Sequence, residues 1–150
     1  MNQLDNKLMN FRRFIEDEAN TKSLNNLYIM TSVINTYYEF IAQAYNENLN
    51  TRNNHKNNLD TILKDGRITQ SQFDVMNETR IVRNKILHNL SYLVTAQDVI
   101  EFHNNCLPNK NPQFLAPEQV ENSLLNAIIN GYCIIDNQLY SDLWRQLGRP

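Results

Sequence analysis

The chain has 150 residues, of which 41% are hydrophobic and 20% charged, and its formal net charge at pH 7 is −2. This length favours one domain, spanning residues 1–150, with a hydrophobic core of its own. A pI near 5.9 argues against the broad basic face of proteins that hold nucleic acid by neutralising many phosphates, so any RNA contact has to be local.

The N-terminal part predicts an outer helix followed by a central one. The first is expected from about Leu4 to Glu18, where apolar residues recur at spacings of four, three and four. The second is expected from about Ser23 to Asn46, and it is apolar over more than half of its circumference, which places it at the centre of a bundle. Its segment Tyr37-Tyr38-Glu39-Phe40 could line a nucleotide-binding cleft, but aromatic residues at helical spacing are more often core.

An asparagine-rich stretch from Asn46 to Asn58 predicts a surface loop, because asparagine side chains compete for backbone hydrogen bonds and disfavour a helix. His55 lies within this stretch and is expected to be solvated. A short helix should follow over Leu59 to Lys64, and the Asp65-Gly66 pair after it suits a turn or a left-handed helix end.

The next helix carries the most informative residues of the chain. The segment Thr69-Gln70-Ser71-Gln72 matches a capping box, so the helix is expected to begin near Gln70. Arg80, Asn84 and His88 form an i, i+4, i+8 line on it, and the Asn84 amide can therefore reach the imidazole ring of His88. Roughly opposite this line, apolar residues at spacings of seven, four and four face a core: Val75, Val82, Ile86 and Leu90.

Arg83 belongs to the same helix but lies about 140° around it from His88. Its long side chain, or a second subunit, has to close that gap. Arg80, Arg83 and Lys85 together form a local basic patch, relieved by Glu78, and we take Arg80 and Lys85 as candidate substrate-binding residues.

The C-terminal third predicts two further helices separated by a proline-containing loop. Thr95-Ala96-Gln97-Asp98 offers an N-cap for a helix that runs to about Asn104 and buries Val99, Ile100 and Phe102 or its neighbours. The last helix is expected from Pro117 to about Leu147, with Cys133 or Ile135 facing inward. Gly131 inside it costs about 1 kcal/mol relative to alanine and is expected to mark a close helix crossing. Trp144 should pack in the bundle or in a dimer interface.

The expected fold is all-α, a single bundle of five or six helices. Cys106 and Cys133 are too few for a disulfide framework and are expected to be reduced thiols. His103 and Cys106 stand at metal-ligand spacing, but a structural zinc site needs four ligands, so we expect no metal and no other cofactor. The polar segment Met1–Phe14 lacks the apolar core of a signal peptide, and no apolar run is long enough to span a membrane; we expect a cytoplasmic protein.

The segment Arg83-Asn84-Lys85-Ile86-Leu87-His88 resembles the Arg-polar-x3-His signature of the HEPN superfamily of small all-helical domains. The resemblance covers six residues late in a helix of a short helical chain. It implies a homodimer in which two motifs face one cleft, and an endoribonuclease of the toxin or anti-phage defence type. HEPN toxins paired with a nucleotidyltransferase antitoxin often carry a tyrosine two residues after the histidine; this chain has Leu90 there, and Tyr92 comes two positions later.

The same resemblance implies roles for three residues. His88 would be the acid/base residue, Arg83 would bind the scissile phosphate, and Asn84 would orient the histidine. RNA would supply its own nucleophile, the 2′-hydroxyl, so the reaction would need no metal ion. One histidine cannot easily act as both base and acid, and a symmetric dimer would bring the second copy.

Two alternatives from other classes stay open. The chain could be a non-catalytic HEPN-like dimer that binds a protein or nucleotide partner. An antitoxin or activator protein is a candidate partner of the endoribonuclease itself. It could also be a helical regulatory or assembly protein in which the motif is coincidental. Catalysis requires Arg83 and His88 to be accessible in a shared cleft, whereas coincidence predicts that they lie apart.

Overall fold

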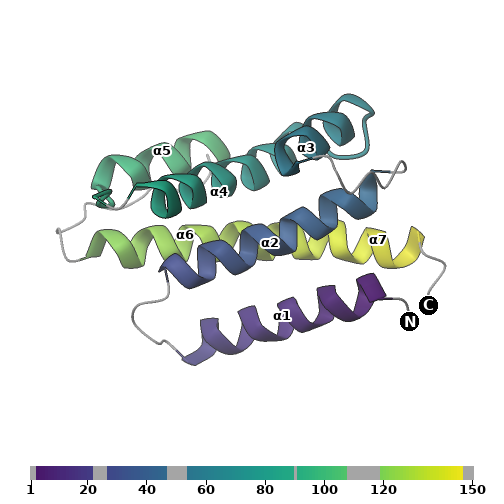
Figure 1. Ribbon diagram of the computed structural model, residues 1–150, viewed down its shortest axis with the longest axis horizontal. Helices are drawn as coiled ribbons and strands as arrows, with labels where there is room; N and C mark the ends of the chain where they lie inside the picture. The colour runs from purple at the N-terminus through teal and green to yellow at the C-terminus, as the bar shows by residue number, and fades with distance from the viewer. Residues whose placement is uncertain (1–2, 22–26, 47–53, 90, 108–118, 147–150) are drawn as a thin grey trace.

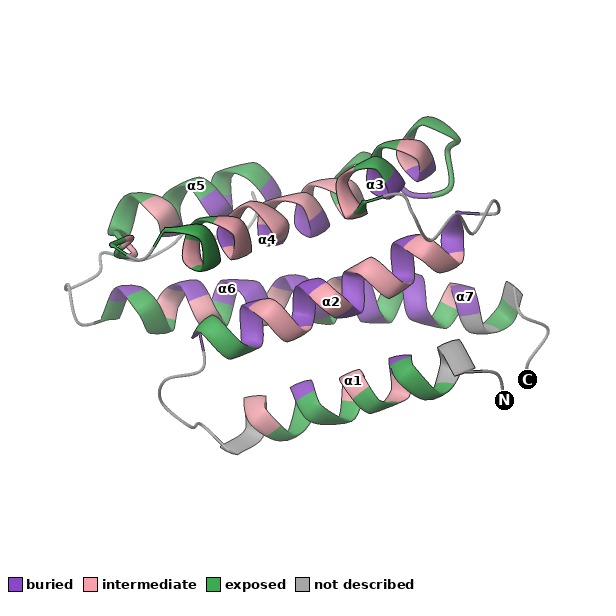
Figure 2. Cartoon of the chain, viewed as in Figure 1, coloured by how far each residue is buried: buried purple, intermediate pink, exposed green. Residues whose placement is uncertain are grey.

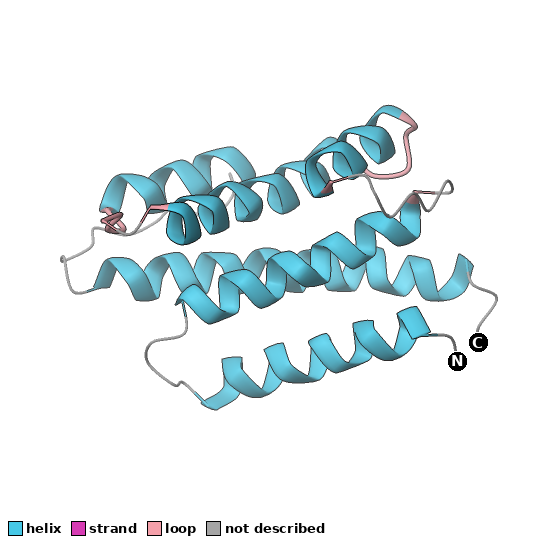
Figure 3. Cartoon of the chain, in the orientation of Figure 1, coloured by secondary structure: helices cyan, strands magenta, loops and turns pink. Residues whose placement is uncertain are grey.

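The computed structural model describes residues 3–21, 27–46, 54–89, 91–107 and 119–146 (Figure 1). Within these ranges every regular element is a helix and no strand is present, which confirms the all-α prediction (Figure 3). No helix in the described ranges is long and apolar enough to cross a membrane. In chain order the elements are α1 (Gln3–Thr21), α2 (Leu27–Tyr45), α3 (His55–Lys64), α4 (Gln70–His88), α5 (Ala96–Cys106), α6 (Val120–Ile135), a π-helical segment (Asp136–Tyr140) and α7 (Ser141–Gln146).

Helix α2 lies at the centre of the bundle, as its apolar circumference predicts. It contacts α1 on one side and α3, α4 and α6 on the others (Figure 1). Ile34, Tyr37, Tyr38 and Ile41 are fully buried, and buried positions run along most of the helix (Figure 2). The aromatic pair of Tyr37 and Tyr38 therefore belongs to the core, as we expected from its spacing.

A polar cluster joins α1 and α2 to the end of α6. The Arg12 guanidinium donates to both carboxylate oxygens of Asp136, over 2.8 Å from Nε and 3.1 Å from Nη2. The Tyr37 hydroxyl donates to Asp136 Oδ1 over 2.5 Å. The guanidinium also lies 4.0 Å from the centroid of the Tyr140 ring. The Asp136 carboxylate is thus buried with its charge and its hydrogen bonds satisfied.

Both predicted N-caps of the middle helices are confirmed. Thr69 Oγ1 accepts from the Gln72 backbone N–H over 3.2 Å, and Gln72 Oε1 accepts from the Thr69 N–H over 2.9 Å, which completes the capping box of α4. Thr95 caps α5 in the same way with Asp98. Before α4, Gly66 has φ +72°, the left-handed turn expected there.

Several expectations are wrong in detail. The predicted loop from Asn46 to Asn58 ends earlier, because Asn54 acts as an N-cap and accepts from the Asn57 N–H over 2.8 Å, so α3 begins at His55. Residues 47–53 of that stretch lie outside the described residues. Ile100 is 39% exposed instead of buried. The last helix is interrupted by the π-helical segment, and the side chain of Trp144 lies outside the described residues.

The predicted close crossing at Gly131 is confirmed where α6 passes α4. A Cβ added to Gly131 would lie 2.9 Å from Val75 Cγ1. Real Cβ atoms do not approach a neighbour so closely, and a β-branched valine has little rotameric freedom with which to move away. Glycine at this position therefore sets the distance between α4 and α6.

We expect Gly131→Ala to lower the free energy of unfolding by about 1 kcal/mol, because overpacking costs about 1–3 kcal/mol and the gain in helix propensity is about 1 kcal/mol. Urea unfolding measures the difference. In a Val75→Ala background the same substitution should lose its penalty, since the colliding methyl group is gone. A Gly131→Ala protein more stable than wild type would contradict the close crossing.

Candidate functional site

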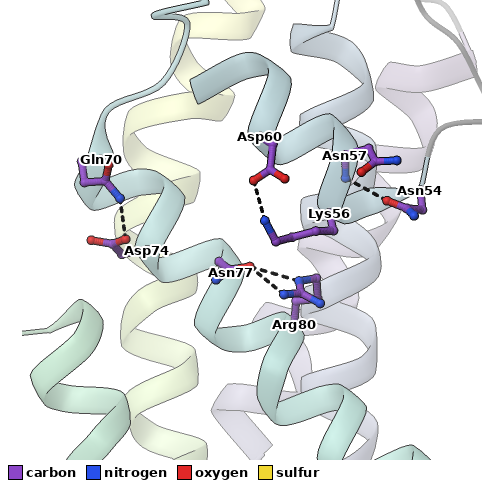
Figure 4. Close-up of polar contacts among 8 residues, drawn as sticks. All are labelled: Asn54, Lys56, Asn57, Asp60, Gln70, Asp74, Asn77 and Arg80. Atoms are coloured by element: carbon purple, nitrogen blue, oxygen red, sulfur yellow. Dashed lines mark hydrogen bonds and ion pairs between the residues drawn. The ribbon is translucent and has the colours of Figure 1, made fainter. Parts of the chain in front are cut away.

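A polar cleft of about 300 Å³ lies where α2, α3 and α4 meet. Asn35 and Glu39 of α2 form one wall, the start of α3 forms a second, and one face of α4 forms the third. Figure 4 shows the side chains of Asn54 and Lys56 at the start of α3 and Arg80 on α4. The complete lining is Asn35, Glu39, Asn54, His55, Lys56, Arg80, Arg83 and Asn84.

The cleft brings together three of the five site residues expected from the sequence, namely Arg80, Arg83 and Asn84. His88 does not line it. That residue is the last of α4 and is exposed, one turn beyond Asn84. Lys85 points to another side of the helix, where its Nζ lies 3.6 Å from Asp98 Oδ1 of α5.

Uncharged amides orient the two arginines of the cleft. Arg80 donates from Nε and Nη2 to Asn77 Oδ1, over 3.1 and 2.9 Å (Figure 4). Arg83 Nη1 donates to Asn84 Oδ1 over 3.3 Å. The Asn84 oxygen therefore faces Arg83, and no hydrogen bond joins Asn84 to His88 among the described residues. Both guanidinium groups keep further N–H donors for a ligand.

Helix α2 contributes acceptors to the cleft. Asn35 Nδ2 donates to Glu39 Oε1 over 3.2 Å, and Asn35 Oδ1 is buried with no hydrogen-bond partner in the described structure. Burial raises the pKa of Glu39 above its ordinary value, and the charge of Arg83 opposes that rise. Glu39 is thus the member of the Tyr37–Phe40 segment that faces the cleft.

His55, which we expected to be solvated, is the residue that the sequence analysis missed. Both of its ring nitrogens are buried and have no hydrogen-bond partner in the described part of the chain. Burial, then the nearby charges of Arg80 and Arg83, lower the pKa of His55 to about 4. The imidazole is therefore neutral at pH 7. An asparagine directly before the histidine was the available signal, since an N-cap would have placed His55 on a helix.

The cleft carries more positive than negative charge. Arg80, Arg83 and Lys56 face Glu39, and Lys56 also pairs with Asp60 of its own helix over 2.6 Å. The free N–H groups in the first turn of α3 add a partial positive charge. Such a site suits an anion with several acceptor oxygens, such as a phosphate. No cluster of three or more residues suited to hold a metal ion occurs among the described residues.

Comparison of the chain with protein-family models, with curated proteins and with solved structures finds no match.

The lowered pKa of His55 predicts a pH dependence of stability. In the unfolded chain the imidazole takes up a proton near pH 6.5, whereas in the folded protein it does so near pH 4. Above about pH 6.5 the imidazole is neutral in both states, and the free energy of unfolding has its full value. As the pH falls towards 4, the unfolded chain binds a proton that the folded protein does not, so the free energy of unfolding decreases by up to about 3 kcal/mol.

We expect His55→Gln to flatten the dependence of the unfolding free energy on pH between 6.5 and 4, as measured by urea unfolding at a series of pH values. Lys64→Gln on the same helix, at an exposed position, is the matched control and should keep the wild-type slope. An identical slope in the His55→Gln protein would show that this imidazole is not held neutral by the fold.

Proposed function

We propose that the protein is a HEPN-like, metal-independent endoribonuclease of the toxin or anti-phage defence type. The observation that carries the proposal is the convergence of Arg80, Arg83 and Asn84 on one cation-rich cleft, with His88 exposed one turn further along the same helix. A phosphodiester held by the arginines fits the charge of the cleft. Six residues at the family spacing support the family assignment.

In this reaction the 2′-hydroxyl of RNA attacks the adjacent phosphorus. One His88 imidazole accepts the proton of the 2′-hydroxyl, and a second, protonated His88 donates a proton to the departing 5′-oxygen. The Arg83 guanidinium binds the non-bridging oxygens, on which negative charge accumulates in the transition state. The products are a 2′,3′-cyclic phosphate and a free 5′-hydroxyl, so atoms and protons balance.

A homodimer would supply what the single chain lacks. His88 lies about 6 Å along the axis of α4 from Asn84 and outside the cleft of its own chain. Exposed apolar side chains occur next to it and shortly after it in the chain, Leu87 by 50% and Leu93 by 76%, and Ile100 of α5, which packs on α4, is exposed by 39%. Exposed apolar side chains of this kind occur at protein interfaces when they form one patch. A second copy that covers this region would bring its own His88 towards the substrate.

The position of His88 also favours a second candidate function. A cleft that binds phosphate without an acid/base residue at hand describes a non-catalytic HEPN-like dimer that holds a nucleotide or a protein partner. Such a protein would bind RNA or nucleotides through Arg80 and Arg83 and leave them intact.

We expect the wild-type protein to cleave structured RNA in EDTA and to leave 2′,3′-cyclic phosphate ends. His88→Ala should lower the cleavage rate at least about 100-fold, because general acid–base catalysis contributes about 10²–10⁴. Arg83→Ala should have a comparable effect, and Arg13→Ala, an exposed arginine on α1, should cleave as wild type. Cleavage retained by His88→Ala would contradict the mechanism, and intact RNA that binds wild type would favour the second function.

We expect Leu87→Asp to convert the dimer to a monomer, because it places a charge in the apolar region that the partner would cover. Sedimentation velocity measures the mass of both forms. Phe14→Asp is the control, since Phe14 is also exposed, by 40%, but lies on α1, on the far side of α2 (Figure 1). A monomeric wild type, or a Leu87→Asp dimer, would exclude this interface.

A further inference from the structure

The imidazole of His55 is the least satisfied polar group of the cleft. Neither ring nitrogen has a partner in the described structure, although both are shielded from water. A buried polar group without a hydrogen bond destabilises the folded protein. A fold that keeps such a group beside two arginines gains stability when a ligand supplies the missing acceptor.

The charges around His55 define the ligand that would satisfy it. Arg80 and Arg83 of α4 and Lys56 of α3 are the cations that line the cleft with it, and Glu39 of α2 is the anion. The two arginines oppose protonation of the imidazole. An anion placed between them would screen their charge and would itself accept a hydrogen bond from the ring. Phosphate offers enough oxygens to serve both arginines and the histidine at once.

The wall of the cleft formed by α2, opposite the arginines, is complementary to a hydrogen-bond donor instead of an anion. Asn35 is 1% exposed, its Oδ1 has no partner, and its amide nitrogen is already engaged by Glu39. A buried acceptor without a partner, on a residue that lines the cleft, is complementary to a hydroxyl or amino hydrogen. A volume of about 300 Å³ holds a phosphate with a sugar attached.

We propose that His55 is a substrate-binding residue of this cleft, which donates a hydrogen bond from its imidazole to the phosphate of a ribonucleotide, while Asn35 Oδ1 accepts one from a sugar hydroxyl. This inference rests on the proposed function for its ligand class and adds a residue from α3 that lies outside the Arg83–His88 motif. A phosphate beside the ring also favours the protonated imidazole, in which both ring nitrogens are donors, so binding takes up a proton. Affinity therefore rises as the pH falls.

The test uses the 150-residue chain with His88→Ala, in which the proposed cleavage should be at least about 100-fold slower, and uridine 3′-monophosphate as the probe. Histidine ring signals followed by NMR give the pKa of His55 with and without the probe. We expect it to rise from about 4 towards its ordinary value of 6.5 when the probe is bound. A pKa that does not change at saturating probe overturns the proposal.

Affinity measurements provide the second arm. His55→Gln should weaken binding of the probe about tenfold at pH 5.5 and much less at pH 8, whereas the control Lys64→Gln on the same helix should bind as the parent protein. Equal affinity of His55→Gln at pH 5.5, in a protein with the parent's thermal unfolding midpoint, overturns the role of His55. Equal binding of both the 2′-deoxy and the 5′-deoxy analogues of the probe overturns the role of Asn35.

These outcomes are separable from those of the cleavage assay. If nucleotide binding depends on His55 and the wild-type protein does not cut RNA, this inference is supported and the proposed endoribonuclease function is contradicted. RNA cleavage that depends on His88, together with a His55 pKa that does not change when the nucleotide binds, would support the endoribonuclease and contradict this inference.

Discussion

The burial of α2 is the constraint on which the other elements depend. Ile34, Tyr37 and Ile41 of this helix are fully buried, and burial of an apolar side chain contributes about 1.5–3 kcal/mol. Because α1, α3, α4 and α6 all pack on α2, none of them can shift without exposing part of it. The polar residues of α2 must then lie where the surrounding helices do not close. Asn35 and Glu39 lie at such a place, and the polar cleft is the gap that they line.

The cluster of Arg12, Tyr37 and Asp136 holds the opposite side of α2 in register with the C-terminal helices. Burial and the Asp136 carboxylate raise the pKa of Tyr37 above its ordinary value, so its hydroxyl remains a donor at neutral pH. The π-helical segment begins at Asp136 and ends at Tyr140, whose ring lies against the same guanidinium. The Arg12–Asp136 ion pair and the Tyr37 hydrogen bond thus join α1, α2 and the end of α6. They hold α2 on the side opposite the cleft.

Sequence periodicity and capping predicted the elements whose causes are local. The central position of α2 follows from apolar residues over more than half of its circumference, the start of α4 from the Thr69 capping box, and the helix crossing from Gly131. Three of the expected site residues meet because their spacing fixes their direction on α4. The sequence could not show how far neighbouring helices extend: α3 lines the cleft beside Arg80 but leaves the last turn of α4, with His88, outside it. The burial of His55 depends on that same tertiary contact, so a polar sequence context suggested the wrong environment.

The electrostatics of the cleft favour binding of an anion, which is a separate requirement from the proposed cleavage. Arg80 and Arg83 are oriented by the neutral amides of Asn77 and Asn84, which fix the guanidinium groups without cancelling their charge. Donors held in place in this way need little reorganisation when an anion arrives, and this is the condition under which electrostatic stabilisation is most effective. The neutral imidazole of His55 adds a group whose charge can follow that of the ligand. Under the proposed function, binding of an anion would therefore need only groups that one chain assembles, whereas cleavage would need His88 to approach from outside the cleft. A homodimer that brings a second His88 to the cleft would add RNA cleavage to anion binding.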